Sequence, residues 1–394
     1  MSATALSPRA SSLRASVEDG KAKTWIVGVC MPLMYLLFGV TWMGFVPLMP
    51  EMLAQTGAEP RDGALFITII SMAKSIVPIL AGLVAARFGL GTTLRAAGVL
   101  ILVGAIAPWL PSYAAVVAVR FAFGVGGAVW VTLMGPVVLA ALPSGARPVA
   151  NAVNGVAVNT GVVIAFAVML PLKNALGAPA ALTLASAGAG LCVAALAFVG
   201  KIGDAQKPVS AVDTLKAYGR SLGSSTTWIL ALASTGPLAL YLVLNTFLGV
   251  HLQHTLGASL DTAAARALAS HWLLWMNVWG VPSSLLAGVL LAKVWTDPRP
   301  YLVVASVVVP CAVYGALHAD SDAARAALFA LVGFGMFFPV SPLITTVQKM
   351  PGMTASSLGL ILGTMWSVSY VASSLIPTAF GPLSATIDLG TLLT

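Results

Sequence analysis

The sequence predicts an all-α integral membrane protein, and three observations lead to this fold class. Of the 394 residues, 59% are hydrophobic and 8% are charged, and the mean hydropathy is +0.96. Soluble domains carry roughly a quarter of charged residues, so a soluble protein is excluded. The apolar residues also form continuous runs of about twenty, the length of a membrane-crossing helix, whereas a β-barrel is built from alternating strands of about ten.

Eleven apolar runs are long enough to cross a bilayer as helices. In chain order they cover residues 25–48, 64–86, 93–111, 114–141, 149–171, 179–200, 226–250, 267–292, 300–318, 324–347 and 354–376. Short loops between the runs hold most of the charged residues, which predicts a multi-pass helical protein. The three cysteines lie inside the runs and are expected to behave as small apolar residues.

The basic residues indicate how the chain is oriented. With the N-terminus in the cytoplasm, fourteen Lys and Arg residues face the cytoplasm and four (Arg61, Lys173, Arg266 and Arg325) face outward. This excess follows the positive-inside rule, so the net charge of +8 reflects orientation and we expect no nucleic-acid partner. Residues 1–24 are predicted to be a cytoplasmic tail, because no short apolar core with a cleavage site marks them as a signal peptide.

Two halves of the chain resemble each other. Gly124 and Gly126 in the fourth run recur as Gly333 and Gly335 in the tenth. The polar segment 201–225 separates six runs from five. Tandem halves of this kind place a substrate site at their interface, near mid-membrane.

The repeat sets the predicted domains. We expect an N-terminal six-helix bundle at residues 25–200, a cytoplasmic linker at 201–225 and a C-terminal helix bundle at 226–394. A twelfth run that would match 179–200 is missing after Pro377. We expect the chain to be trimmed at its C-terminus, because an even pair of halves would otherwise be broken.

Two cations lie inside apolar runs. Lys74 is twelve residues after Asp62, about 18 Å along a helix and therefore close to the midplane. Arg120 is seven residues after Tyr113, roughly 10 Å deep. A charged side chain at such depth is costly and usually faces a watery cavity, so we expect Lys74 to bind an anionic group or to titrate during transport. A structural role, through snorkelling or bonds to carbonyls, is the alternative for both residues.

No carboxylate lies inside a run. Glu51 follows the first run and Asp62 precedes the second, so at most these two acids gate the outer mouth. A cationic substrate usually needs a buried acid, so the charge pattern favours an anion. Proton coupling would have to use Lys74 or a residue of the mouth, or it does not occur.

Aromatic and amide side chains extend the predicted substrate site. Tyr35, Phe38, Trp42 and Phe45 share one face of the first run, and Trp272, Trp275 and Trp279 share one face of the eighth. They could pack an organic substrate, or they could be helix-packing or interfacial residues. Besides Lys74 and Arg120, the residues expected to bind substrate are Tyr35, Trp42, Asn159, Asn245, Trp275, Asn277, Trp279, Trp366 and Tyr370.

The chain resembles the major facilitator superfamily over nearly its whole length. Arg120, Gly124 and Gly126 match the RxxxGxG pattern of that family's fourth helix, and Arg87 and Gly89 match its loop motif between helices 2 and 3. The resemblance implies two six-helix bundles, no cofactor, and a gating role for Arg87 and Gly89. The family's acidic residue in this loop motif is replaced by Ala86.

Two branches of the family bear on the cargo. Drug-proton antiporters carry a Gly-Pro-rich motif in helix 5, whereas this chain has no proline between Asn154 and Pro171. The spacing of Asn154-Gly and Asn159 in helix 5 is similar to that in the nitrate/nitrite branch, which also keeps a basic residue in helix 2. Such anion-transporting branches, of nitrate/nitrite or cyanate type, also carry a basic residue in helix 8, where Asn277 and Gly280 stand here.

The first hypothesis is a monomeric secondary transporter in the bacterial inner membrane that moves a small, organic or inorganic anion by alternating access. The second is a proton-coupled exporter of amphipathic metabolites or drugs, and the third is a receptor or scaffold that kept the fold without transport. A coupling proton or counter-anion stays open. No phosphate loop, nucleophile motif or metal-ligand spacing occurs in the sequence, so we expect no enzyme, cofactor or metal.

Overall fold

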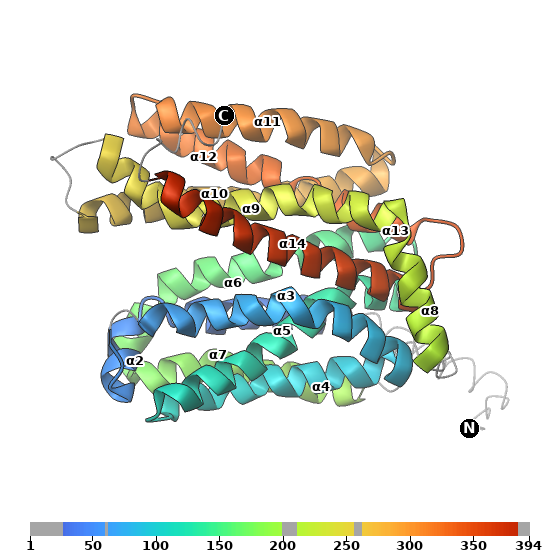
Figure 1. The fold of residues 1–394 in the computed structure, drawn as a ribbon, viewed down its shortest axis with the longest axis horizontal. Helices are drawn as coiled ribbons and strands as arrows, with labels where there is room; N and C mark the ends of the chain where they lie inside the picture. The colour runs from blue at the N-terminus through green and yellow to red at the C-terminus, as the bar shows by residue number, and fades with distance from the viewer. Residues whose placement is uncertain (1–26, 60–61, 199–210, 256–261, 385–394) are drawn as a thin grey trace, which may run out of the picture.

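The computed structural model describes residues 27–59, 62–198, 211–255 and 262–384 (Figure 1). Within these ranges every regular element is a helix, and ten helices are long and apolar enough to cross a membrane. The shorter apolar helix Val27–Met43 precedes them. The predicted fold class, an all-α membrane protein, is confirmed.

The helices follow the predicted runs in order. After Val27–Met43 they are α2 (Met49–Thr56), α3 (Gly63–Phe88), α4 (Leu90–Val103), η2 (Gly104–Trp109), α5 (Tyr113–Ala141), α6 (Arg147–Leu176), α7 (Ala178–Phe198), α8 (Ala211–Leu222), α9 (Ser225–Thr255), α10 (Thr262–Lys293), α11 (Arg299–His318), α12 (Asp322–Phe337), α13 (Val340–Gln348) and α14 (Ala355–Ser384).

Prolines explain two differences from the predicted helix boundaries. The first helix ends at Met43 and not at residue 48, because Pro47 disfavours helix in the residue before it and Pro50 opens the separate helix α2. The tenth run, predicted as one helix over 324–347, is interrupted around Pro339, which lacks the N–H needed to continue α12.

Two further differences concern the second half of the chain. The last helix continues to Ser384, eight residues beyond the predicted end at 376. Part of the linker predicted at 201–225 is the helix α8, which carries Val212 and Leu215 together with Lys216 and Arg220. Residues 1–24 and 201–210 lie outside the described residues, so the predicted domain boundaries stay predictions.

Helix packing repeats between the two halves. Gly124 lets α5 approach α3, since an added Cβ would lie 3.0 Å from the Cα of Ile70. Gly333 lets α12 approach α10 in the same way, against the backbone of Met276. Figure 1 shows the helices before α8 gathered below and α9–α14 above, with α8 crossing between them on the right. The paired glycines therefore support the internal repeat in three dimensions.

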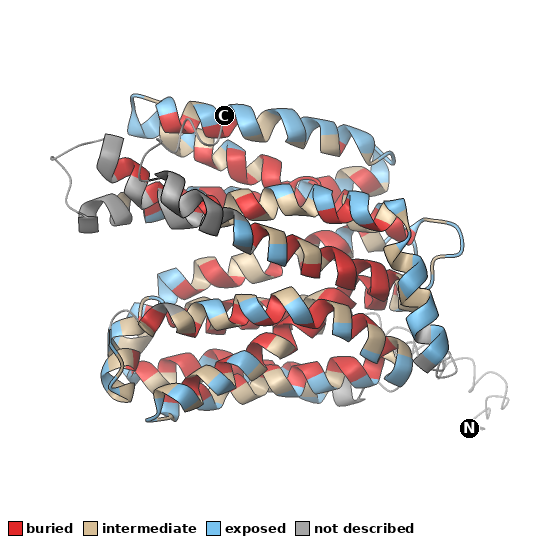
Figure 2. Cartoon of the chain, in the orientation of Figure 1, coloured by how far each residue is buried: buried red, intermediate tan, exposed pale blue. Residues whose placement is uncertain are grey.

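The two bundles meet on the side where α8 lies, called here the linker side. An added Cβ on Gly82 of α3 would lie 2.8 Å from the carbonyl oxygen of Gly359 in α14, so these helices touch backbone to backbone. Figure 2 shows the part of α14 nearest this side as buried. On the same side, α6 packs against α10 and α13.

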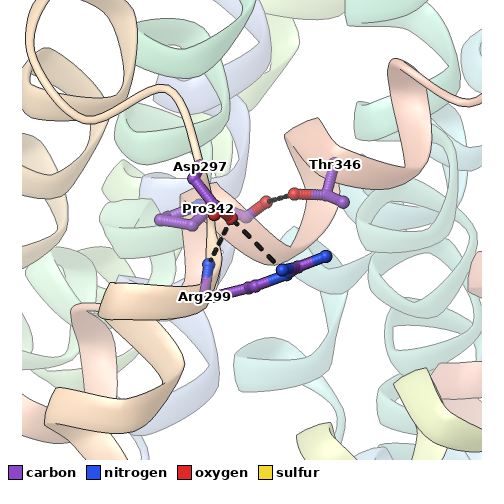
Figure 3. Close-up of polar contacts among 4 residues, drawn as sticks. All are labelled: Asp297, Arg299, Pro342 and Thr346. Atoms are coloured by element: carbon purple, nitrogen blue, oxygen red, sulfur yellow. Dashed lines mark hydrogen bonds and ion pairs between the residues drawn. The ribbon is translucent and has the colours of Figure 1, made fainter.

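Short polar contacts stabilise the turn into α11 and the helix α13 (Figure 3). The Asp297 carboxylate accepts the backbone N–H of Arg299 at 3.0 Å and lies 3.9 Å from its Nε, which fixes the turn into α11. Thr346 Oγ1 donates to the carbonyl of Pro342 at 2.7 Å inside α13.

Candidate functional site

Lys74 lies near the middle of α3, and its side chain is fully buried. Four aromatic rings surround its ammonium group. The distances from Nζ to the ring centroids are 4.0 Å for Trp42, 5.0 Å for Phe38, 5.5 Å for Tyr370 and 5.6 Å for Tyr35. These four residues are called the aromatic cage. The negative faces of such rings attract a cation, most strongly where water is excluded.

The cage is the main neighbour of the ammonium. The ammonium also donates a hydrogen bond to the Tyr35 hydroxyl, at 3.5 Å. Among the described residues, no carboxylate forms an ion pair with Lys74. Lys74 therefore places a buried cationic side chain at the contact of the two bundles, and a buried charge without an acidic partner is costly.

Helix spacing places three members of the cage. Tyr35, Phe38 and Trp42 are three and four residues apart on the helix Val27–Met43, so their side chains line one face. The Tyr35 and Phe38 rings stack at 5.6 Å. The sequence already placed Phe38 on this face, but only Tyr35 and Trp42 were predicted to bind substrate.

Pro78 aligns Lys74 with the opposite bundle. A proline in a helix removes the N–H that would reach the carbonyl four residues earlier, here that of Lys74. Close by, the backbone N–H of Ile79 donates to Ser367 Oγ of α14 at 3.3 Å. Ser367 is three residues from Tyr370, so this contact holds the fourth ring of the cage against Lys74. The cage therefore joins both bundles.

Arg120 adjoins the cage but is occupied by other contacts. It is buried, with 1% of its surface exposed. Its Nε donates to the carbonyl of Phe66, its Nη2 donates to the carbonyl of Trp42 at 3.0 Å, and its guanidinium carbon lies 3.7 Å from the Phe45 ring centroid. Arg120 thus ties α5 to α3 and to the helix that carries the cage, which is a positioning role.

Other predicted site residues lie near the cage or apart from it. The Trp366 ring is 6.1 Å from that of Tyr370. Asn277 is buried and donates to the carbonyl of Leu273 at 2.8 Å, and its Oδ1 has no hydrogen-bond partner among the described residues. Asn159 is half-buried on α6, and the side chain of Asn245 lies outside the described residues.

Two predicted residues do not join the cage. Trp275 and Trp279 are 39% and 44% exposed. Trp279 lines a groove of about 360 Å³ between α6 and α10, and both tryptophans line one of about 520 Å³ between α10 and α12. Trp272 also faces α12, where it is buried and stacks on Phe329.

The residues predicted to gate the channel have identifiable surroundings. Glu51, in the first turn of α2, pairs with Lys173 near the end of α6. Asp62 precedes α3 and accepts the backbone N–H of Glu59 at 3.2 Å. Arg87 is exposed at the end of α3, and Gly89 joins α3 to α4 with φ of 89°, a conformation that favours glycine. Their gating roles stay predictions.

Two bundles of membrane-crossing helices, with Lys74 buried where they meet, are the arrangement found in membrane transporters built from tandem halves. The sequence pattern of the Major Facilitator Superfamily matches residues 32–374, so the chain belongs to that family and is a secondary transporter that works by alternating access. No curated protein sequence matches the chain.

Solved structures share the fold at low identity. The human organic anion transporter MFSD10 (TETRAN) has a TM-score of 0.73 at 16% identity, covering 93% of this chain and 96% of that one. The proton:xylose symporter XylE, bound to 6-bromo-6-deoxy-D-glucose, gives 0.69 at 15%, with coverages of 93% and 90%. A variant of the Escherichia coli fucose:proton symporter FucP gives 0.66 at 12%, with coverages of 93% and 94%.

Lys74 and Arg120 should differ in their effect on stability. Arg120→Met removes the bonds to the carbonyls of Phe66 and Trp42 and leaves that of Trp42, near the end of its helix, without this partner, which costs about 1–3 kcal/mol, so we expect a clear drop in Tm. Lys74→Met removes an unpaired buried charge and should leave Tm unchanged or raise it. Thermal unfolding in detergent measures both, and an equal loss in the two variants would show that Lys74 is structural.

The Glu51–Lys173 ion pair should make a pH-dependent contribution to the free energy of unfolding. The hydrogen bond from Lys173 lowers the pKa of the Glu51 carboxyl below its ordinary value. The pair therefore stabilises the fold at pH values above the ordinary pKa of a glutamate. This stabilisation is lost as the pH falls through the lowered pKa of Glu51. We expect Glu51→Gln to cost up to about 1 kcal/mol at neutral pH, with the difference vanishing in acid. The exposed Asp297→Asn is the control and should show a smaller difference.

Proposed function

We propose that this transporter carries an anion, and that Lys74 recognises its negative group. One observation carries the proposal: a fully buried ammonium, without a carboxylate partner among the described residues, at the contact of the two bundles. An anion entering the cage would supply the missing charge, and the gain is large because the surroundings are apolar.

Alternating access would expose Lys74 to each side of the membrane in turn. Three rings of the cage belong to the N-terminal bundle and Tyr370 belongs to α14. When the bundles rock apart, Tyr370 moves away from Nζ and opens a path to it. Arg120 keeps Trp42 in place during this motion through its bond to the Trp42 carbonyl.

The setting of the transporter follows from the charge distribution. We place it in a bacterial inner membrane as a monomer, with the N-terminus and the linker side in the cytoplasm, because basic residues concentrate on that side. The structure is then closed toward the cytoplasm. Glu51 and Asp62 lie at the outer mouth, and Arg87 and Gly89 at the cytoplasmic loop.

A second candidate is a proton-coupled exporter of amphipathic compounds. The aromatic cage favours it, because four rings suit an apolar body, and Lys74 could then exchange a proton during transport. Among solved structures with this fold are an organic anion transporter and two sugar:proton symporters, so the fold itself leaves both candidates open.

Transport by Lys74 variants tests the proposal. In proteoliposomes, Lys74→Met should reduce anion uptake or exchange at least about a hundredfold, since a charge-assisted contact is worth a few kcal/mol. Lys74→Arg should retain part of it. Lys293→Met, an exposed lysine at the end of α10, is the matched control. Wild-type flux in folded Lys74→Met would contradict the proposal, and pH-dependent efflux of bulky compounds that small anions do not inhibit would favour the exporter.

A further inference from the structure

The number of free charges in the site limits what it can bind. Lys74 and Arg120 are the only buried Lys or Arg side chains of the described residues. The Arg120 guanidinium already bonds two carbonyls and lies against the Phe45 ring. One positive charge therefore remains for a substrate.

A single free charge discriminates against multivalent anions. A dicarboxylate or a phosphate ester would bring a second negative charge into an apolar site, where an unpaired charge is strongly disfavoured. Phosphates and carboxylates are often bound by two parallel hydrogen bonds from one guanidinium group. The guanidinium of Arg120 already donates to two backbone carbonyls and does not offer this pair of bonds to a ligand.

The walls of the site indicate the rest of the substrate. Phe38 has no polar atom, and the indole N–H of Trp42 is directed to the carbonyl of Ile67 at 3.4 Å. Trp366 extends the aromatic surface beside Tyr370. Polar groups that could meet a ligand at the cage are the hydroxyls of Tyr35 and Tyr370. A small hydrated inorganic anion would find few donors here, whereas a ring or a short hydrocarbon would find large apolar contact area.

Resting on the proposed function, we infer that the cargo is an organic monoanion: one carboxylate, or a similar singly charged group, on an apolar body the size of one ring. The carboxylate pairs with Lys74 Nζ and accepts from the Tyr35 hydroxyl. The body takes the place that the Tyr370 ring occupies against the ammonium in the closed structure.

A binding panel with purified protein tests this inference. The probes are benzoate, its neutral analogue benzamide, the dianion phthalate, and nitrate. Benzoate should bind with a Kd at least about ten times lower than each of the other three, and Lys74→Met should abolish that preference. The control Lys293→Met should bind as the wild type does.

Each contrary result has a distinct meaning. Tighter binding of nitrate or phthalate that still depends on Lys74 overturns the organic monoanion and leaves anion transport standing. Equal binding of benzamide and benzoate, unchanged in Lys74→Met, overturns both. Absence of benzoate binding at millimolar concentration overturns the monoanion inference.

A separate observation concerns how the bundles close on the linker side. Asn151 of α6 donates through Nδ2 to Thr345 Oγ1 at 2.9 Å and to Gln348 Oε1 at 2.8 Å, both in α13. Gln348 Nε2 in turn donates to the carbonyl of Gly135 in α5 at 2.9 Å. All three side chains are buried. Asn151, Thr345 and Gln348 are called the amide latch.

Neighbouring contacts between the bundles are also uncharged. Ser341 Oγ donates to the carbonyl of Pro148 at 2.6 Å, and Ser284 Oγ donates to that of Ala152 at 3.3 Å. In the last turns of α3, Ala86 stands where the family's loop motif has an acid. Bonds between neutral buried groups are not screened by salt, unlike ion pairs.

We propose that the amide latch holds the closed state of the linker side and makes it insensitive to ionic strength. Asn151→Leu would remove the donor to Gln348 Oε1 and Thr345 Oγ1, and would therefore favour separation of the bundles on the linker side.

Spin labels on exposed positions of the two bundles, Thr92 and Lys349, measure this separation. The wild-type distance distribution should be the same at low and high salt, and Asn151→Leu should add a population at longer distance. Thr160→Val on the same helix, which loses only a bond to its own α6 backbone, should behave as the wild type. A distribution that shifts with salt, or one that Asn151→Leu leaves unchanged, overturns the proposal.

Discussion

The attraction between the Lys74 ammonium and four aromatic rings is the interaction around which this transporter is organised. The ammonium is buried where the two bundles meet, and no carboxylate of the described residues forms an ion pair with it. The rings offset part of the desolvation cost, and Arg120 and the Pro78 region of α3 hold the elements that carry them. A carboxylate near Lys74 would stabilise the closed protein further, but it would also compete with an anionic substrate.

The second constraint is that the two bundles must both adhere and separate. Backbone contact between Gly82 and Gly359 allows close packing without interlocking side chains. The hydrogen bonds beside it join neutral amides, hydroxyls and carbonyls, whose net contribution is about 1 kcal/mol each. Several such contacts give a closed state that is well defined and yet within reach of substrate binding energy.

Most of the fold could be predicted from the sequence, because the features that determine the helices are local in the chain. Run length and charge spacing located the helices, and the spacing of Tyr35, Phe38 and Trp42 placed three cage residues on one face. Pro47 and Pro339 also stand in the sequence, so the two helix breaks were within reach of the same reasoning. The role of Arg120 was not predictable in this way, because it depends on which carbonyls its guanidinium reaches, those of Phe66 and Trp42. Trp42 is near the end of its helix, where the last carbonyls lack intrahelical partners, and only the true end at Met43 reveals this. Tyr370 joins Lys74 by contact between distant segments, which no local pattern records.

The interruption at Pro339 divides one membrane crossing into two pieces with different neighbours. The outer piece, α12, is anchored inside its own bundle by stacking of Phe329 on Trp272. The inner piece, α13, faces the other bundle through Thr345 and Gln348. Without a continuous backbone ladder between them, the inner piece can pivot while the outer one stays fixed. Substitutions within the nine residues of α13 can therefore change how firmly the linker side closes, while the apolar interior of the second bundle is left undisturbed.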